Sequence, residues 1–168
     1  MLIGHLPAGY FLTRYLIKKN KLPLNIWWLG LGLIASILPD FDIAYIVFHD
    51  TTVSSHRNYF TDYPFFYLLA FLMALLVYFF NKKKWLIKGI YLIFANVLLH
   101  FLLDTPFVGI KWLWPVYNKF IGIYNAGFTG GFLVGNYFTH WYWYLEIALW
   151  LAAITAVIIS YKKGELKN

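Results

Sequence analysis

The chain alternates long apolar segments with short polar ones. The apolar segments cover residues 2–17, 22–38, 64–80, 85–103 and about 137–161. Segments of this length and composition predict helices that cross most or all of a bilayer. The sequence therefore predicts an all-α fold, an integral membrane helical bundle of four to five spans. We expect one membrane-embedded domain over residues 1–168, with outer loops at about 39–63 and 104–136.

Two of these segments leave alternatives open. Residues 2–17 are short and contain His5 and Arg14, so they form either a short span packed inside the bundle or an interfacial helix. Residues 105–136 are rich in glycine and aromatic side chains and show neither a clean helical nor a clean strand pattern. They predict short interfacial helices or a re-entrant loop over the mouth of the bundle.

The composition excludes a soluble protein. The chain is 61% hydrophobic and 12% charged, with a mean hydropathy of +0.62, whereas soluble domains carry about 25% charged residues. It contains no cysteine, so any bound metal would need His, Asp, Glu, Asn or backbone oxygen as ligands. The net charge of +7 comes largely from lysines that flank apolar segments, which indicates membrane topology and not nucleic-acid binding.

Charged and polar residues are segregated along the predicted path. If the segments cross the membrane alternately, counting the first as a crossing, eleven of the fourteen Lys and Arg residues fall on one side. The positive-inside rule makes that side cytoplasmic. The opposite side receives ten His and Asp residues: His5, His49, His56, His100, His140, Asp40, Asp42, Asp50, Asp62 and Asp104. This convergence predicts a shared metal or catalytic site at the extracytoplasmic mouth; unrelated helix caps and hydrogen bonds are the alternative.

Two pairs of residues are the first candidates for this site. His100 and Asp104 are four residues apart and share one face of a helix. In or near hydrocarbon, both are costly unless they are paired, bind a metal or face water. Asp40 and Asp42 follow Pro39. In an extended loop both carboxylates would point the same way and could reach one metal or two adjacent metals, whereas the alternative is an N-cap.

The remaining candidates lie before and inside later segments. His56 is a potential metal ligand, and Arg57 suits a bidentate grip on a phosphate or carboxylate. Asp62 precedes Pro64 by two residues, which leaves ligand and helix cap equally open. Glu146 lies within the last apolar segment and predicts pairing with Arg, Lys or a hydroxyl, or a protonated carboxyl. With no cysteine and no G-x-S-x-G, hydrolysis would use a metal-activated water.

Five short motifs occur in order along most of the chain: Gly4-His5-Leu6-Pro7-Ala8-Gly9-Tyr10, Leu38-Pro39-Asp40-Phe41-Asp42, His56-Arg57-Asn58-x-x-Thr61, His100-x-x-x-Asp104 and Trp114-Pro115. In order and spacing they resemble the membrane-bound, metal-dependent hydrolases of the LexA-regulated inner-membrane type. The His-x-x-x-Asp element is similar to that of zinc-dependent phospholipases C, which cleave phosphodiesters. The resemblance implies a bacterial inner-membrane protein that hydrolyses a phosphoester or lipid-linked ester at the outer face of the membrane.

The resemblance also implies roles for individual residues. It places a divalent metal, zinc first and manganese or magnesium as alternatives, on His5, Asp40, Asp42, His56, His100 and Asp104. From the residues themselves, we expect His56, Arg57 and Asp62 to carry the reaction, with a membrane lipid or lipid-linked molecule as substrate. The family often has Thr-His where this chain has Thr61-Asp62. That departure leaves open a preference for harder ions or a loss of activity.

Two other functions compete with hydrolysis. The first is a non-catalytic membrane scaffold or partner subunit with a structural metal or polar site, and a partner that is a second copy or another membrane protein stays open. The second is a small transporter. A transporter would need polar residues at mid-span on several helices, and here only Arg14, Asn96 and Glu146 qualify.

Overall fold

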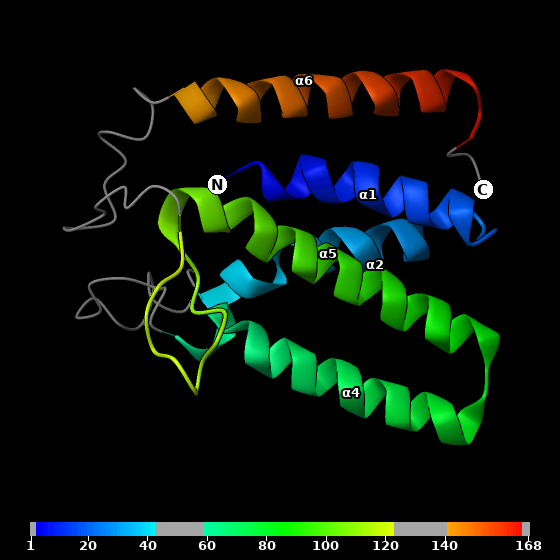
Figure 1. Cartoon of the computed structure of the whole chain (residues 1–168). Coiled ribbons are helices and arrows are strands. Elements are labelled where there is room, and N and C mark those ends of the chain that lie inside the picture. The colour runs from blue at the N-terminus through cyan, green and yellow to red at the C-terminus, as the bar shows by residue number, and fades with distance from the viewer. Residues whose placement is uncertain (1–2, 43–58, 123–140, 166–168) are drawn as a thin grey trace.

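The computed structural model describes residues 3–42, 59–122 and 141–165, and these form a bundle of five α-helices (Figure 1). The helices are α1 (His5–Lys19), α2 (Ile26–Ile37), α4 (Pro64–Asn81), α5 (Lys84–Val108) and α6 (Trp141–Lys162). Two 3₁₀ turns, η1 (Leu38–Asp40) and η3 (Phe60–Asp62), follow α2 and precede α4. In this described part, strand-like pairing is limited to the isolated bridge between Ile110 and Ile121. The predicted all-α membrane bundle is confirmed.

Helix length separates three long helices from two short ones. The helices α4, α5 and α6 are long and apolar enough to cross a membrane, and residues Ile26–Asp40 form a shorter apolar element. The helix α1 has 15 residues, which is about 22 Å of helix. It packs against α2, α5 and α6. Of the two alternatives for this segment, the structure therefore supports a short helix packed inside the bundle.

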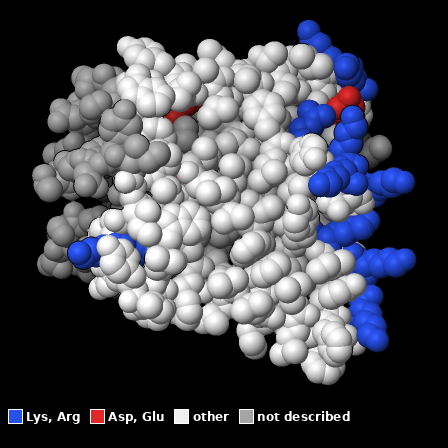
Figure 2. Space-filling model, in the orientation of Figure 1, with Lys and Arg blue, Asp and Glu red and all other residues white. Residues whose placement is uncertain are grey.

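Successive helices run in alternating directions, as the colours of Figure 1 show. The start of α1, the end of α2, the start of α4 and the end of α5 consequently meet at one end of the bundle. Lys and Arg side chains gather at the opposite end, on the right of Figure 2, apart from a small patch on the left. Lys and Arg are thus largely separated from the end of the bundle where these four helix ends meet, as predicted. The assignment of the basic end to the cytoplasm remains a prediction from the positive-inside rule.

The start of α2 and the end of α5 differ from the ends predicted from sequence. The helix α2 begins at Ile26 and not at residue 22, because the Asn25 side chain caps it by accepting the N–H of Trp28 at 3.1 Å. The helix α5 continues past Asp104 to Val108 with Pro106 in its last turn. His100 and Asp104 therefore lie inside the helix and not at its end. Residues 123–136 of the predicted mixed loop lie outside the described part.

Small side chains allow α1 and α2 to approach closely. A Cβ at Gly9 would collide with Ser36, and one at Gly32 would collide with Thr13. Close approach through small residues is the usual way in which membrane helices pack. Behind this contact the buried Thr13 hydroxyl donates to Asn96 Oδ1 at 3.3 Å, and Asn96 Nδ2 donates to the Leu92 carbonyl oxygen at 2.9 Å. This arrangement ties α1 to both α2 and α5.

The helix α6 packs against α1 and is tied to that helix at both ends. At the basic end Arg14 donates to the Ser160 hydroxyl and forms an ion pair with Glu165 at 2.7 Å. Hydrogen bonds from Ser160 and Arg14 lower the pKa of Glu165. At the other end Glu146 accepts the backbone N–H of Ile3 at 2.7 Å. One partner of Glu146 is therefore a backbone amide, which lies outside the pairing with Arg, Lys or a hydroxyl expected from sequence.

The close contact between α1 and α2 predicts opposite effects for two glycines of the same helix. Gly32→Ala should destabilise the protein by about 1–3 kcal/mol, because its methyl group forces Thr13 to move. Gly30→Ala is the matched control, since nothing lies within 4 Å of its Cβ position, and it should be neutral or stabilising by up to about 1 kcal/mol. Unfolding of the detergent-solubilised protein, followed by tryptophan fluorescence, measures both. Equal stabilities for the two variants would contradict the packing described here.

Candidate metal centre

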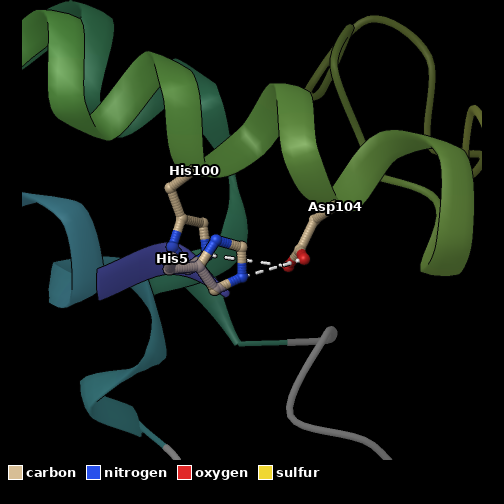
Figure 3. Close-up of side chains that lie close together, drawn as sticks. All are labelled: His5, His100 and Asp104. Carbon is tan, nitrogen blue, oxygen red and sulfur yellow. Dashed lines mark ion pairs between the residues drawn. The ribbon is translucent and has the colours of Figure 1, made fainter. Parts of the chain in front are cut away.

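Five His and Asp side chains meet at the end of the bundle where α1 begins. They come from α1 (His5), η1 (Asp40), η3 (Asp62) and α5 (His100 and Asp104). Ligand atoms of His5, His100 and Asp104 all lie within 4.8 Å of one another, and so do those of Asp40, Asp62 and His100. Because His100 belongs to both groups, we treat the five residues as one His/Asp cluster. Figure 3 shows three of them, with His5 on α1 facing His100 and Asp104 on α5.

The two imidazole rings direct the same ring nitrogen towards the same carboxylates. His5 Nε2 lies 3.0 Å from Asp104 Oδ1 and 3.9 Å from Asp40 Oδ2. His100 Nε2 lies 3.6 Å from Asp104 Oδ2 and 3.5 Å from Asp40 Oδ1. The rings are stacked, with centroids 3.8 Å apart and an interplanar angle of 23°. The space beside the rings is therefore bordered by two nitrogens and the oxygens of two carboxylates.

A backbone carbonyl of α2 fixes the tautomer of His100. Its Nδ1 lies 2.9 Å from the Ser36 carbonyl oxygen. Since a carbonyl can only accept, Nδ1 must carry the proton, and in the neutral ring the lone pair is on Nε2. That lone pair faces Asp40 and Asp104. A hydrogen bond from the other ring nitrogen to a backbone carbonyl is typical of metal-binding histidines, because it fixes both tautomer and ring orientation.

Most of the cluster is buried. His5, His100, Asp62 and Asp104 are each at most 2% exposed, and only the Asp40 side chain, at 17%, has appreciable exposure. Neighbouring buried carboxylates are costly without a compensating cation. A divalent ion would be such a cation, and imidazole with carboxylate suits zinc as well as harder ions. The donor set therefore fits a divalent metal.

The conformation after α2 differs from the extended loop expected there, and the metal role of Asp42 stays a prediction. Residues 38–42 are helical and not extended: Leu38–Asp40 form η1, and Phe41 has φ −65° and ψ −20°. In a helical turn, residues two apart do not share a direction. Asp40 joins the cluster, whereas Asp42 is buried at 6% exposure but belongs to neither group of converging ligand atoms found among the described residues.

The position of Asp62 also resolves one alternative. The N-cap of α4 is Tyr63, and no side-chain cap bond is present there. Asp62 belongs to η3, is 2% exposed and lies near Asp40 and His100. The interpretation of Asp62 as the cap of α4 is therefore wrong, and its proximity to the cluster supports a role as ligand or reacting group.

Several predicted residues lie outside the described part of the chain. These are His49, Asp50, His56, Arg57 and His140. The metal role of His56 and the catalytic roles of His56 and Arg57 accordingly stay predictions. For His5, Asp40, Asp62, His100 and Asp104 the structure gives proximity, and metal ligation itself also stays a prediction.

Sequence reasoning missed the partners that orient the cluster. The Ser36 carbonyl that holds His100 is a backbone group and gives no sequence signal. Glu146 was recognisable as an unusual residue in an apolar segment, but its backbone partner, two residues before His5, was not.

Comparison with known proteins identifies a family. A family model described as YdjM inner membrane protein matches residues 1–166. No curated protein and no solved structure matches the chain.

The fit of the donor set predicts metal-linked stability. Protein stripped with a chelator and then given zinc at about a hundred times its dissociation constant should gain about 2.7 kcal/mol in unfolding free energy. Asp104→Asn should lose most of this gain, because Asp104 lies in the cluster. Asp42→Asn, the matched control outside the two ligand groups, should keep it. Chemical unfolding with and without zinc measures the effect. An unfolding free energy of the wild type that zinc does not change would contradict metal binding by the cluster.

Proposed function

The chain belongs to the YdjM inner membrane protein family, and on that premise we propose that it is a membrane-embedded, metal-dependent hydrolase. Its substrate would be a phosphoester or lipid-linked ester at the extracytoplasmic face. The observation that carries the proposal is the buried His/Asp cluster, in which side chains from α1, η1, η3 and α5 converge at one end of a membrane bundle.

His5, His100 and Asp104 would hold the divalent metal, with Asp40 as a further ligand. Their ligand atoms lie close enough to share one ion, and they supply the imidazole and carboxylate donors that zinc accepts. A divalent ion in such a site acts as a Lewis acid and provides a nucleophilic water at neutral pH. The resemblance noted from sequence, zinc-dependent phosphodiester cleavage, is consistent with that chemistry.

Other residues of the chain would orient a ligand, transfer the proton and bind the substrate. Ser36 keeps the proton of His100 on Nδ1 and so leaves Nε2 available. Asp62, close to His100 and Asp40, would accept the proton of the attacking water on its carboxylate. Arg57, outside the described residues, would bind the substrate anion. The oxygen of the water would bond to phosphorus as the P–O bond to the alcohol breaks, and the proton taken by Asp62 would pass to the leaving alcohol oxygen.

The location of the cluster favours a substrate in the membrane. It lies at one end of a bundle with long apolar helices, opposite the end where lysines gather (Figure 2). If the basic end is cytoplasmic, the cluster lies near the outer headgroups. Asp40, the most exposed member of the cluster, would be the point of access.

One observation favours a second function, a non-catalytic membrane scaffold with a structural metal. His5, His100 and Asp104 are almost completely buried, and structural metal sites are closed whereas catalytic sites keep an open position. Under this alternative the metal would stabilise the bundle, and no substrate would reach it.

A hydrolysis assay separates the two functions. The full chain in lipid nanodiscs, loaded with zinc, should release phosphorylated headgroup from a labelled phospholipid, and a chelator should abolish release. Asp62→Asn should lower turnover by about 10²- to 10⁴-fold, because a general base is lost, and should leave zinc content unchanged. His100→Ala should lose both turnover and zinc. Mass spectrometry of the products and metal analysis of the same samples are the measurements.

Each outcome of this assay assigns a role. Stoichiometric zinc without hydrolysis of phospholipid or lipid-linked phosphoesters would support the structural alternative. Loss of zinc in Asp62→Asn would make Asp62 a ligand in place of a base. An absence of bound divalent metal in the wild type would overturn the proposal.

A further inference from the structure

Two side chains of α6 hold the backbone of one residue just before α1. Glu146 Oε2 accepts the N–H of Ile3 at 2.7 Å, and Trp150 Nε1 donates to the Ile3 carbonyl oxygen at 2.9 Å. Glu146 and Trp150 are four residues apart and therefore share one face of α6. Both peptide groups of Ile3 thus have their partners on a helix that is more than 140 residues away in sequence.

Ile3, which accepts and donates these two hydrogen bonds, lies two residues before His5, the first residue of α1. The N-cap of α1 is Gly4, and no side chain caps the helix there. The start of α1 is consequently held by α6 and not by a local cap. A shift of Ile3 would be passed directly to His5, since one residue separates them.

Glu146 is a costly residue for an ordinary contact between helices. It is 0% exposed in the first part of α6, which is otherwise apolar enough to cross a membrane. A buried carboxylate at such a position carries a large desolvation cost. Its hydrogen bond to the Ile3 N–H, at 2.7 Å, reaches the segment that bears His5.

From these contacts we infer that α6 positions His5 in the His/Asp cluster, with Glu146 and Trp150 as positioning residues that act through the backbone of Ile3. The inference rests on the proposed metal site and extends it to a helix that provides none of the five residues of the cluster. Metal ligands must be held within about 0.5 Å of their productive position. A loosened Ile3 would therefore weaken the contribution of His5, whose Nε2 lies 3.0 Å from Asp104 Oδ1.

A double-mutant cycle on zinc affinity tests this role. With the full chain in nanodiscs and a competing chelator, Glu146→Ala should weaken zinc binding about 10- to 100-fold, the usual effect of removing an orienting partner. Trp150→Phe should weaken it several-fold. In the His5→Ala background neither change should weaken binding further, because both act through His5. Equal losses with and without His5 would overturn the inference.

Two matched variants separate positioning from general damage. Glu146→Gln keeps an oxygen that can accept the Ile3 N–H and should recover most of the affinity. Arg14→Gln releases α6 at its other end, where Arg14 bonds Ser160 and Glu165, and should leave zinc affinity near that of the wild type. A loss of affinity in Arg14→Gln as large as that in Glu146→Ala would contradict a specific role for Glu146.

A metal-free measurement keeps this inference separate from the proposed function. In histidine-selective ¹⁵N spectra of the apo protein, Glu146→Ala should shift the His5 ring nitrogens more than those of His100, since the Ser36 carbonyl holds His100. His5→Gln assigns the signals. If wild-type protein binds no zinc, the proposed function fails, and the His5 shift still decides the positioning role. Unchanged His5 signals would overturn it.

Discussion

The rest of the structure depends on one constraint, the cost of burying imidazoles and carboxylates together at the end of a membrane bundle. His5, His100 and Asp104 are almost fully enclosed, and stacked rings direct both Nε2 atoms towards Asp104 and Asp40. Burial of such a group is costly unless its charges are compensated and each side chain is held in place. A divalent ion meets the first requirement with the donors present, and the surrounding helices meet the second.

Three features of the bundle position the cluster: the packing of α1 on α2, the alternating helix directions and the contacts of α6 with Ile3. Close packing of α1 on α2 at Gly9 and Gly32 brings His5 beside the end of α2, where the Ser36 carbonyl orients His100. Alternating helix directions bring the start of α1, the end of α2, the start of α4 and the last part of α5 to the same end (Figure 1). Hydrogen bonds from Glu146 and Trp150 of α6 hold the backbone of Ile3, just before α1. A membrane protein with two short helices can thereby assemble a dense polar site on a largely apolar frame.

Sequence periodicity and charge predict the frame and much of the cluster. The i,i+4 spacing of His100 and Asp104 and the segregation of His and Asp from Lys are properties of the residues themselves. The sequence does not separate Asp42 from Asp40, because Pro-Asp-x-Asp is compatible with an extended loop as well as with the helical turn observed. Asp62 as cap or cluster member was equally undecided, since Tyr63 takes the cap position only in the folded turn. The Ser36 carbonyl and the Ile3 peptide are backbone partners, which no residue pattern can reveal.

The central claim is that two imidazoles and neighbouring carboxylates bind one metal ion. X-ray absorption at the zinc edge of the full chain, loaded with one equivalent of zinc, tests it most directly. The account predicts two imidazole nitrogens at about 2.0–2.1 Å together with carboxylate oxygen, and the loss of one imidazole in His100→Ala. A spectrum with no imidazole ligands, or one that His100→Ala leaves unchanged, would contradict the claim.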